Sequence, residues 1–161
     1  MNKIYLLLGS NMGNSQQQLK KAIQHIKKQI GHCIRLSSLY KTAAWGNTSQ
    51  PDFCNQVIIV QTKLTAAQTM QTILAIEKNM GRIRTKKNAP RIIDIDILFF
   101  NKEITEEKNL IIPHPLLQVR NFVLSPLNEL SPQLKHPILK KSIHQLLRVC
   151  PDKLMVTKIP R

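Results

Sequence analysis

The sequence predicts an α+β fold in which two helices cover one face of an antiparallel sheet, the ferredoxin-like arrangement, with further elements added at the C-terminal end. Strand-like and helix-like apolar patterns follow one another in the order β-α-β-β-α-β. The chain has 161 residues, 42% of them apolar, and no internal repeat or linker, so we expect one domain over residues 1–161. Because many unrelated proteins share this fold, it does not select a function by itself.

The first strand and helix have clear sequence boundaries. Residues 3–8 are apolar on both faces, which predicts a strand at the centre of a sheet. Residues 9–14 include two glycines and two asparagines and predict a turn, after which Ser15 is suited to cap a helix. The helix is expected to end near Gly31, and its apolar stripe consists of Leu19, Ala22, Ile23, Ile26 and Ile30.

The middle of the chain predicts two strands, a helix and another strand. The two strands are expected over residues 33–40 and 53–62, joined by a long loop. Thr65 is expected to begin the second helix and Gly81 to end it. The predicted buried stripe of this helix consists of Met70, Ile73, Leu74 and Met80. A basic loop then leads to a strand over residues 92–100.

The C-terminal part of the chain gives weaker signals. Asn101 and Lys102 predict a hairpin turn, followed by a strand that ends at Ile112. We expect helices over residues 119–130 and 143–149 and a final strand over residues 154–158. These elements are expected to be additions to the ferredoxin-like core.

The charge of the chain is unusual. Lysine and arginine number 24 against 9 aspartates and glutamates, which gives a formal net charge of +15. Such an excess favours polyanionic partners, such as nucleic acid, an anionic membrane or a phosphorylated small molecule. Lys20, Lys21, Lys27 and Lys28 lie on the first predicted helix, where they are typical of a solvated face.

The sequence predicts a cytoplasmic protein without a membrane partner. Its longest apolar runs, residues 4–8 and 57–60, are far shorter than the roughly 20 residues needed to span a bilayer. The N-terminal run ends at Gly9 and does not have the form of a secretory signal. The three cysteines, at positions 33, 54 and 150, have neither disulfide-framework nor zinc-site spacing.

Asp94 and Asp96 are the first candidate functional residues. They alternate with isoleucines along a predicted strand, so both carboxylates face one side, roughly 7 Å apart, while the isoleucines face the core. Paired carboxylates of this kind can bind two Mg²⁺ ions. So short a pattern also occurs on ordinary polar strand faces. Arg82, Arg84 and Arg91 come just before it, however, and metal and guanidinium groups together can neutralise a polyphosphate.

Other segments bear on whether the ligands include a phosphorylated compound and a flat heterocycle. A Walker-type phosphate loop is absent from the sequence, and the glycines of residues 9–15 can equally form a simple strand-to-helix turn. His114 lies between two prolines, and we expect it to donate to phosphate. Phe53 and Phe122 either pack in the core or stack on a flat heterocycle whose edge an amide such as Asn55 would bind.

Several segments together resemble the hydroxymethyl-dihydropterin pyrophosphokinase family of folate biosynthesis. They are Gly9-Ser10-Asn11 with Gly13; Ser38, Tyr40 and Thr42; Gln50-Pro51-Asp52-Phe53 with Asn55 and Val57; Glu77 with Gly81, Arg82 and Arg84; Pro90-Arg91 with Asp94-Ile95-Asp96-Ile97-Leu98; and Ile112-Pro113-His114-Pro115 with Arg120 and Phe122. The resemblance runs in order over most of the chain. It implies an enzyme that transfers the pyrophosphoryl group of ATP to the pterin hydroxymethyl group and releases AMP.

The resemblance also implies roles for individual residues. Asp94 and Asp96 would hold two Mg²⁺ ions and act in catalysis with Arg82 and Arg91. The pterin site would consist of Thr42, Ala44, Trp45, Phe53, Asn55 and Phe122. The ATP site would consist of Glu77, Arg82, Arg84, Arg91, Ile97, Ile111, His114 and Arg120, with backbone near Ile97 and Ile111 against the adenine. The partners would be ATP and 6-hydroxymethyl-7,8-dihydropterin, bound by a monomer, and not nucleic acid.

Two questions stay open at the level of the sequence. Glu77 lies on the apolar stripe of the second helix, where it needs a polar partner, such as a network around Asn11, unless it lies at an exposed edge. The alternative function is an RNA-binding module, which has the same β-α-β-β-α-β order and suits a basic chain. Against this alternative, the aromatic strand motif that stacks RNA bases is absent from the sequence.

Overall fold

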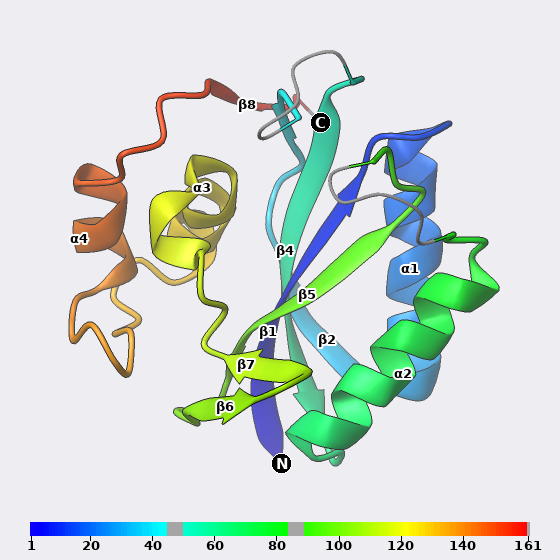
Figure 1. Ribbon diagram of the computed structural model, residues 1–161, viewed down its shortest axis with the longest axis horizontal. Coiled ribbons are helices and arrows are strands. Elements are labelled where there is room, and N and C mark those ends of the chain that lie inside the picture. Colours follow the sequence, from blue (N-terminus) through cyan, green and yellow to red (C-terminus); the bar gives the residue numbers. More distant parts are fainter. Residues whose placement is uncertain (45–49, 84–88, 161) are drawn as a thin grey trace.

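The computed structural model describes residues 1–44, 50–83 and 89–160 and confirms the α+β prediction. The main sheet has, in order, the strands β5 (Asp94–Phe100), β1 (Asn2–Ser10), β4 (Phe53–Thr62), β3 (Tyr40–Thr42) and β8 (Val156–Lys158), and β2 (Gly31–Leu36) also pairs with β4. The pairings β1–β4, β1–β5 and β2–β4 are antiparallel, as in a ferredoxin-like sheet. Helices α1 (Ser15–Gln29) and α2 (Ala66–Asn79) cover one face, and α3 (Asn121–Leu130) and α4 (Ile143–Arg148) lie on the other (Figure 1).

The first strand and helix follow the prediction, with one change at the turn. Strand β1 (Asn2–Ser10) lies between β4 and β5, and α1 is Ser15–Gln29. Asn14, not Ser15, caps this helix, because the Asn14 side chain accepts a hydrogen bond from the backbone N–H of Gln17. Gly9 belongs to β1, so Gly13, with a φ of 64°, is the glycine that makes the turn.

The strand predicted over residues 33–40 is split in two. Its parts are β2 (Gly31–Leu36) and β3 (Tyr40–Thr42), and both pair with β4 (Phe53–Thr62). Ser37 lies between them, and its hydroxyl accepts a hydrogen bond from the backbone N–H of Val57 at 3.0 Å. The Ser37 hydroxyl thus takes the place of a backbone carbonyl as the acceptor for Val57, and the strand is interrupted there.

Helix α2 (Ala66–Asn79) begins after Thr65 as predicted, but its buried stripe differs from the prediction at one position. The buried residues are Ala66, Thr69, Ile73, Ile76 and Glu77, and the partly buried Met70 and Met80 pack beside them. Leu74 is 45% exposed, so placing it on the buried face was wrong. One helical step turns by about 100°, which moves Leu74 off the stripe that contains Ile73.

The segment after the second helix differs from the prediction in its pairing. Strand β5 is Asp94–Phe100, and β6 (Thr105–Glu107) pairs with β7 (Leu110–Ile112) in a separate two-stranded sheet. Asn101 and Lys102 form a turn, but it does not join β5 to a paired neighbour. The Asn101 side chain instead accepts a hydrogen bond from the backbone N–H of Lys3 at 2.8 Å, which ties the turn to β1.

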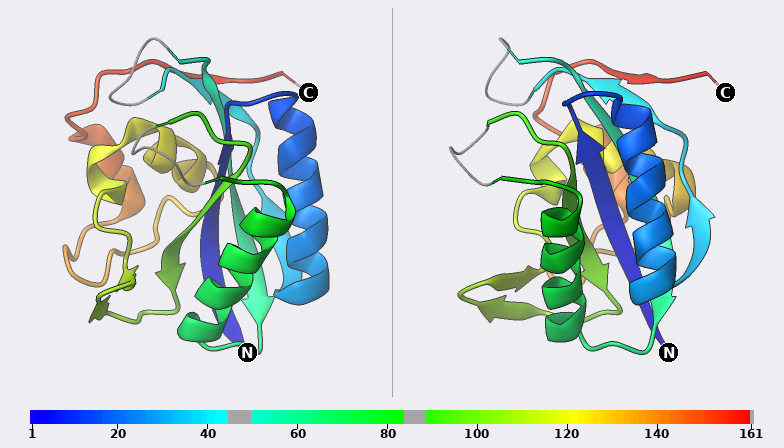
Figure 2. Two further views of the ribbon diagram at one scale, coloured as in Figure 1. Left: turned by 45° about the vertical axis from the view of Figure 1, so that its right-hand side comes forward. Right: turned by 90° about the vertical axis from the view of Figure 1, so that its right-hand side faces the viewer.

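The C-terminal elements build a second core on the other face of the sheet. They are the 3₁₀ turn Leu117–Val119, α3 (Asn121–Leu130), α4 (Ile143–Arg148) and β8 (Val156–Lys158). Leu124 and Leu127 of α3 belong to this core together with Tyr5 and Leu7 of β1. The two cores enclose the sheet from both sides (Figure 2). Within the described ranges, no helix is long and apolar enough to cross a membrane.

Candidate functional site

A pocket is formed by residues from four strands of the main sheet, from α3 and from the loops beside them. It is lined by Leu7, Gly9, Thr42, Ala43, Ala44, Gln50, Phe53, Asn55, Ala89, Arg91, Asp94, Asp96, Arg120 and Phe122. The lining includes both aspartates and five of the six residues expected to bind the pterin. The sixth, Trp45, lies outside the described residues, as does Arg84.

Strand β5 places the two aspartates as the alternation predicts. Ile95 and Ile97 are buried in the core beneath α1 and α2, whereas Asp94 and Asp96 line the pocket on the opposite face. In the described sheet, β5 is an edge strand with β1 as its neighbour. The two carboxylates therefore share a face beside a strand edge that pairs with no other strand of the described sheet.

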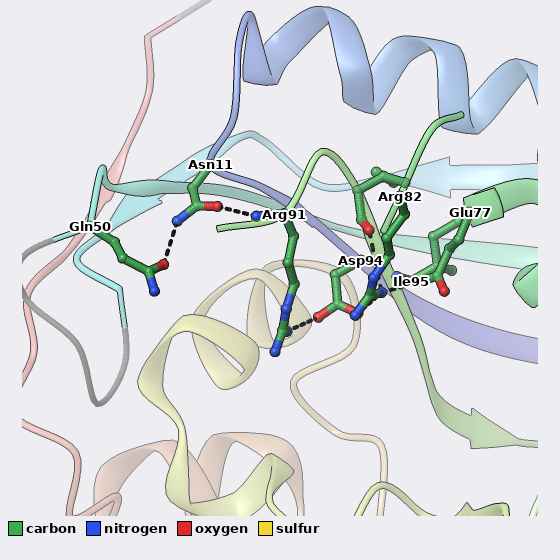
Figure 3. Close-up of polar contacts among 8 residues, drawn as sticks. Asn11, Gln50, Glu77, Arg82, Arg91, Asp94 and Ile95 are labelled. Atoms are coloured by element: carbon green, nitrogen blue, oxygen red, sulfur yellow. Dashed lines mark hydrogen bonds and ion pairs between the residues drawn. The ribbon is translucent and has the colours of Figure 1, made fainter. Parts of the chain in front are cut away.

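Two arginines bind the carboxylate of Asp94 from different sides (Figure 3). Nη1 of Arg82 donates to Oδ1 of Asp94 at 2.8 Å, and Nη1 of Arg91 donates to Oδ2 at 2.7 Å. Arg91 lines the pocket, but the side chain of Arg82 is only 8% exposed and lies behind Asp94. The arrangement favours an indirect role for Arg82, through Asp94, over the direct ATP contact that the resemblance implied.

Glu77 explains how Arg82 can be buried. The carboxylate of Glu77 accepts hydrogen bonds from Nη1 of Arg82 and from the backbone N–H of Ile95, each at 2.8 Å. Burial acts to lower the pKa of Arg82, but the negative charges of Asp94 and Glu77 outweigh it and raise this pKa. Since Glu77 is 3% exposed, the exposed-edge alternative is wrong. Its buried position also disfavours the direct ATP contact that the resemblance implied.

Asn11 connects the turn after β1 to the beginning of β5. Its side-chain oxygen accepts from the backbone N–H of Arg91 at 2.8 Å, and its amide donates to Gln50 at 3.0 Å (Figure 3). The backbone N–H of Asn11 donates in turn to the carbonyl of Arg91 at 3.0 Å. The network around Asn11 therefore holds the backbone of Arg91, shortly before β5 begins.

The electrostatic environment of Asp96 suits a cation. Burial raises the pKa of Asp96, and the negative charges of Asp94 and Glu77 raise it further. In the described part of the chain, Asp94 forms ion pairs with two arginines and Asp96 forms none. The described residues contain no cluster of three or more His, Cys, Asp or Glu side chains. A metal here would combine two carboxylates with substrate oxygens and water, which suits Mg²⁺.

The structure also explains a glycine that sequence analysis assigned to a turn. Gly9 lines the pocket, and a Cβ atom built on it would lie 2.8 Å from Oδ1 of Asn55 and 3.6 Å from Phe53. Any side chain at this position would push Asn55 out of place. Gly9 was part of the family resemblance, but its space requirement depends on the pairing of β1 with β4 and is not visible in the sequence.

His114 lies beside the pocket as a neutral group. Burial lowers its pKa to about 4, and the positive charge of Arg120 contributes to this shift. Nδ1 of His114 accepts the backbone N–H of Leu116 at 3.1 Å, so the proton of the neutral ring sits on Nε2. His114 can therefore donate a hydrogen bond without carrying a charge.

The other residues expected to bind ATP are spread around the pocket. Arg120 lines it, and its guanidinium lies 5.7 Å from the ring centroid of Phe122. Ile97 is buried in the core, so only its backbone could meet a ligand. Ile111 is 46% exposed on β7, where it pairs with Glu106 of β6.

Replacing Glu77 tests the buried charge cluster. Glu77→Ala is expected to lower the free energy of unfolding by about 3–5 kcal/mol, because it leaves the buried Arg82 with one carboxylate fewer and Ile95 without its acceptor. Glu77→Gln keeps an acceptor oxygen and should lose less. Urea unfolding measures both losses. The matched control is Glu103→Ala, which removes a glutamate that is exposed. Equal losses for Glu77→Ala and Glu103→Ala would contradict the role of Glu77.

The pH dependence of stability tests the state of His114. Folding lowers the pKa of His114 from 6.5 to about 4. Its contribution to the free energy of unfolding is therefore complete above pH 6.5 and is lost as the pH falls toward 4. This contribution is expected to fall by about 2 kcal/mol between pH 7.5 and 5. His114→Gln cannot be protonated and should lose less stability over the same range than the wild type. Denaturant unfolding at several pH values measures this, and parallel curves for the two proteins would refute it.

Comparison with known proteins identifies relatives along most of the chain. Residues 5–132 match the family model described as 7,8-dihydro-6-hydroxymethylpterin-pyrophosphokinase (HPPK). The 2-amino-4-hydroxy-6-hydroxymethyldihydropteridine pyrophosphokinase of Aquifex aeolicus is 37% identical over 145 residues, which are 90% of this chain and 90% of that one. The Synechocystis protein of the same name is 39% identical over 141 residues, 87% of this chain and 72% of that one.

Solved structures show that the fold is shared. The Plasmodium falciparum HPPK-DHPS with pteroate matches with a TM-score of 0.75 at 20% identity, over 91% of this chain and 42% of that one. This chain therefore spans less than half of that protein, and at this identity the match shows the fold alone. The family model and the relatives aligned along most of the chain show that this chain belongs to the 7,8-dihydro-6-hydroxymethylpterin pyrophosphokinase family.

Proposed function

We propose that this chain transfers the pyrophosphoryl group of ATP to the hydroxymethyl group of 6-hydroxymethyl-7,8-dihydropterin, with release of AMP, in folate biosynthesis. The observation that carries the proposal is that one pocket contains both a pair of carboxylates and two aromatic side chains beside a buried amide. The chain is proposed to act as one domain and as a monomer. The comparisons give no support to the RNA-binding alternative.

Asp94 and Asp96 would hold Mg²⁺ in the proposed enzyme. The fit rests on the shared face of the two carboxylates and on the raised pKa of Asp96, which marks a negative charge that a cation would stabilise. Bound Mg²⁺ would neutralise the charge that develops on the phosphate oxygens. Arg82 and Arg91 already orient Asp94 by hydrogen bonds to both of its oxygens.

The pterin would bind between Phe53 and Phe122, which line the same pocket from β4 and α3. Asn55 supports this location. It is 3% exposed, and its Nδ2 has no hydrogen-bond partner within the described residues. A buried amide in this state lacks the partner that most buried polar groups have, and a heterocycle edge would supply one. Thr42 and Ala44 line the pocket near this amide and would complete the pterin site.

ATP would bind beside β5, the edge strand of the described sheet. Arg91 and Arg120 line the pocket and would contact phosphate oxygens with charged hydrogen bonds, and the neutral Nε2–H of His114 would add an uncharged donor. The backbone of Ile97, on the edge strand β5, and that of Ile111, on β7, would contact the adenine. With both substrates held, the hydroxymethyl oxygen would attack the β-phosphorus of ATP. The bond between this phosphorus and the oxygen that bridges it to the α-phosphorus would break, and AMP would leave with that oxygen. Positioning and charge neutralisation can supply most of the catalysis of such a step.

Identification of the nucleotide product tests the proposed function. Purified protein with ATP, Mg²⁺ and 6-hydroxymethyl-7,8-dihydropterin is expected to form AMP in amounts equal to the pterin product. Chromatography of a single-turnover reaction separates AMP from ADP. ADP as the main product would show transfer of the γ-phosphoryl group and would contradict the proposal. A reaction without pterin is the control for simple hydrolysis.

Substitution of the aspartates tests the proposed metal site. Asp94→Asn and Asp96→Asn should each lower the single-turnover rate on the order of a thousandfold, because each removes a negatively charged oxygen ligand. Folding should survive in Asp96→Asn, since the change relieves repulsion with Asp94 and Glu77. Rapid-quench kinetics and circular dichroism measure the two effects, with Glu103→Gln as the matched control. A folded Asp96→Asn variant with nearly normal turnover would show that Asp96 is not a ligand.

A further inference from the structure

The two walls of the pocket that carry Thr42 and Phe122 come from different parts of the chain. Thr42 ends strand β3, and Phe122 lies in the first turn of α3. Both residues line the pocket, so the spacing between β3 and α3 sets the width of this part of it. Contacts that fix this spacing therefore bear on ligand binding without touching the ligand.

The beginning of α3 is held by a residue that lies far along the chain. Arg120 occupies the N-cap position and makes no side-chain capping hydrogen bond. Oδ2 of Asp152 instead accepts the backbone N–H of Asn121 at 3.0 Å, while Oδ1 accepts the backbone N–H of Leu154 at 3.0 Å. A carboxylate at this place satisfies a free N–H group and suits the positive end of the helix dipole. The negative charge of Asp152 also acts on the half-buried Arg120, beside Phe122.

The segment that contains Asp152 continues onto the opposite wall. After α4 the chain runs past α3 to β8, which pairs with β3 (Figure 1). The hydroxyl of Thr42 donates to the carbonyl of Met155 at 3.2 Å, and the backbone N–H of Ile159 donates to the carbonyl of Leu39 at 2.8 Å. One stretch of about eight residues thus contacts both walls.

The other end of α3 is tied directly to β3. Glu129 accepts hydrogen bonds from the hydroxyl of Tyr40 at 2.6 Å and from the backbone N–H of Ser38 at 3.1 Å. Burial acts to raise the pKa of Glu129, but the hydrogen bonds from Tyr40 and Ser38 outweigh it and lower this pKa. Nζ of Lys158, on β8, lies 4.0 Å from the same carboxylate. This carboxylate therefore joins α3, β3 and β8 at one point.

We propose that Asp152 and Glu129 are positioning residues, which hold α3 against β3 and β8 and so fix Phe122 relative to Thr42 for binding of the pterin. Asp152 fixes the first turn of α3, and Glu129 fixes the last. The family model matches residues 5–132, so Asp152 lies outside the matched region. The proposal rests on the proposed function, because it takes the pterin as the ligand between these walls.

Binding measurements on matched variants test the proposal. Asp152→Ala is expected to weaken binding of 6-hydroxymethyl-7,8-dihydropterin by about five- to tenfold, while binding of a non-hydrolysable ATP analogue with Mg²⁺ changes by less than about twofold. Asp152→Asn keeps an acceptor oxygen and should recover most of the pterin affinity. Tyr40→Phe removes a donor to Glu129 and should weaken pterin binding in the same direction by about two- to threefold. Calorimetry measures both ligands, with Glu103→Ala as the charge-matched control.

The outcomes separate this proposal from the proposed function. Wild-type protein that binds no pterin would contradict the proposed function and the positioning proposal with it. Wild-type protein that binds the pterin, with Asp152→Ala and Tyr40→Phe unchanged, would overturn the positioning proposal alone. Equal losses for the pterin and the ATP analogue would assign Asp152 a general structural role and also overturn it. If Asp152→Ala does not fold, Tyr40→Phe decides, because it leaves the backbone contacts of Asp152 in place.

Discussion

The buried cluster of Glu77, Arg82 and Asp94 is the interaction on which the rest of the site depends. A guanidinium can be buried behind β5 only when carboxylates surround it, and here one comes from α2 and one from the strand. Glu77 also accepts the backbone N–H of Ile95, so a helix residue holds the first residues of β5 against α2. The direction of the Asp94 carboxylate therefore depends on the packing of α2 against the sheet.

The pocket exists because the second core ends part of the way along β1. Tyr5 and Leu7 face the side covered by α3 and α4, and Leu7 lies at the boundary, since it belongs to the core and also lines the pocket. Gly9 is the next residue on the same face, and its lack of a side chain leaves room for Asn55. The same alternation thus gives an aromatic ring, then an aliphatic side chain, then a glycine beside which Asn55 lies.

Features that depend on local periodicity could be predicted from the sequence, and those that depend on tertiary contacts could not. The shared face of Asp94 and Asp96 follows from the period of a strand, and the order of elements follows from the apolar pattern. The partner of Glu77 lies in another segment, so the sequence left its burial open. Leu74 was misplaced because two neighbouring apolar residues on α2 compete for one stripe. The roles of Asp152 and Glu129 depend on contacts about 30 and 90 residues away and carry no local signal.

The charges of the site suggest why the whole chain is basic. Among the described residues, three arginines of the site (Arg82, Arg91 and Arg120) lie near three carboxyl groups (Glu77, Asp94 and Asp96), so the formal charges of these six residues cancel. Formal charges that cancel attract a triphosphate weakly at a distance, so charges elsewhere on the chain would add attraction before contact. The net charge of +15 supplies such a field, which would speed encounter with an anionic nucleotide and weaken with added salt. Once the nucleotide is in place, Mg²⁺ on the carboxylates would tip the local balance toward the phosphates. The basic surface would then speed association with the nucleotide, and the buried cluster would fix the geometry of pyrophosphoryl transfer.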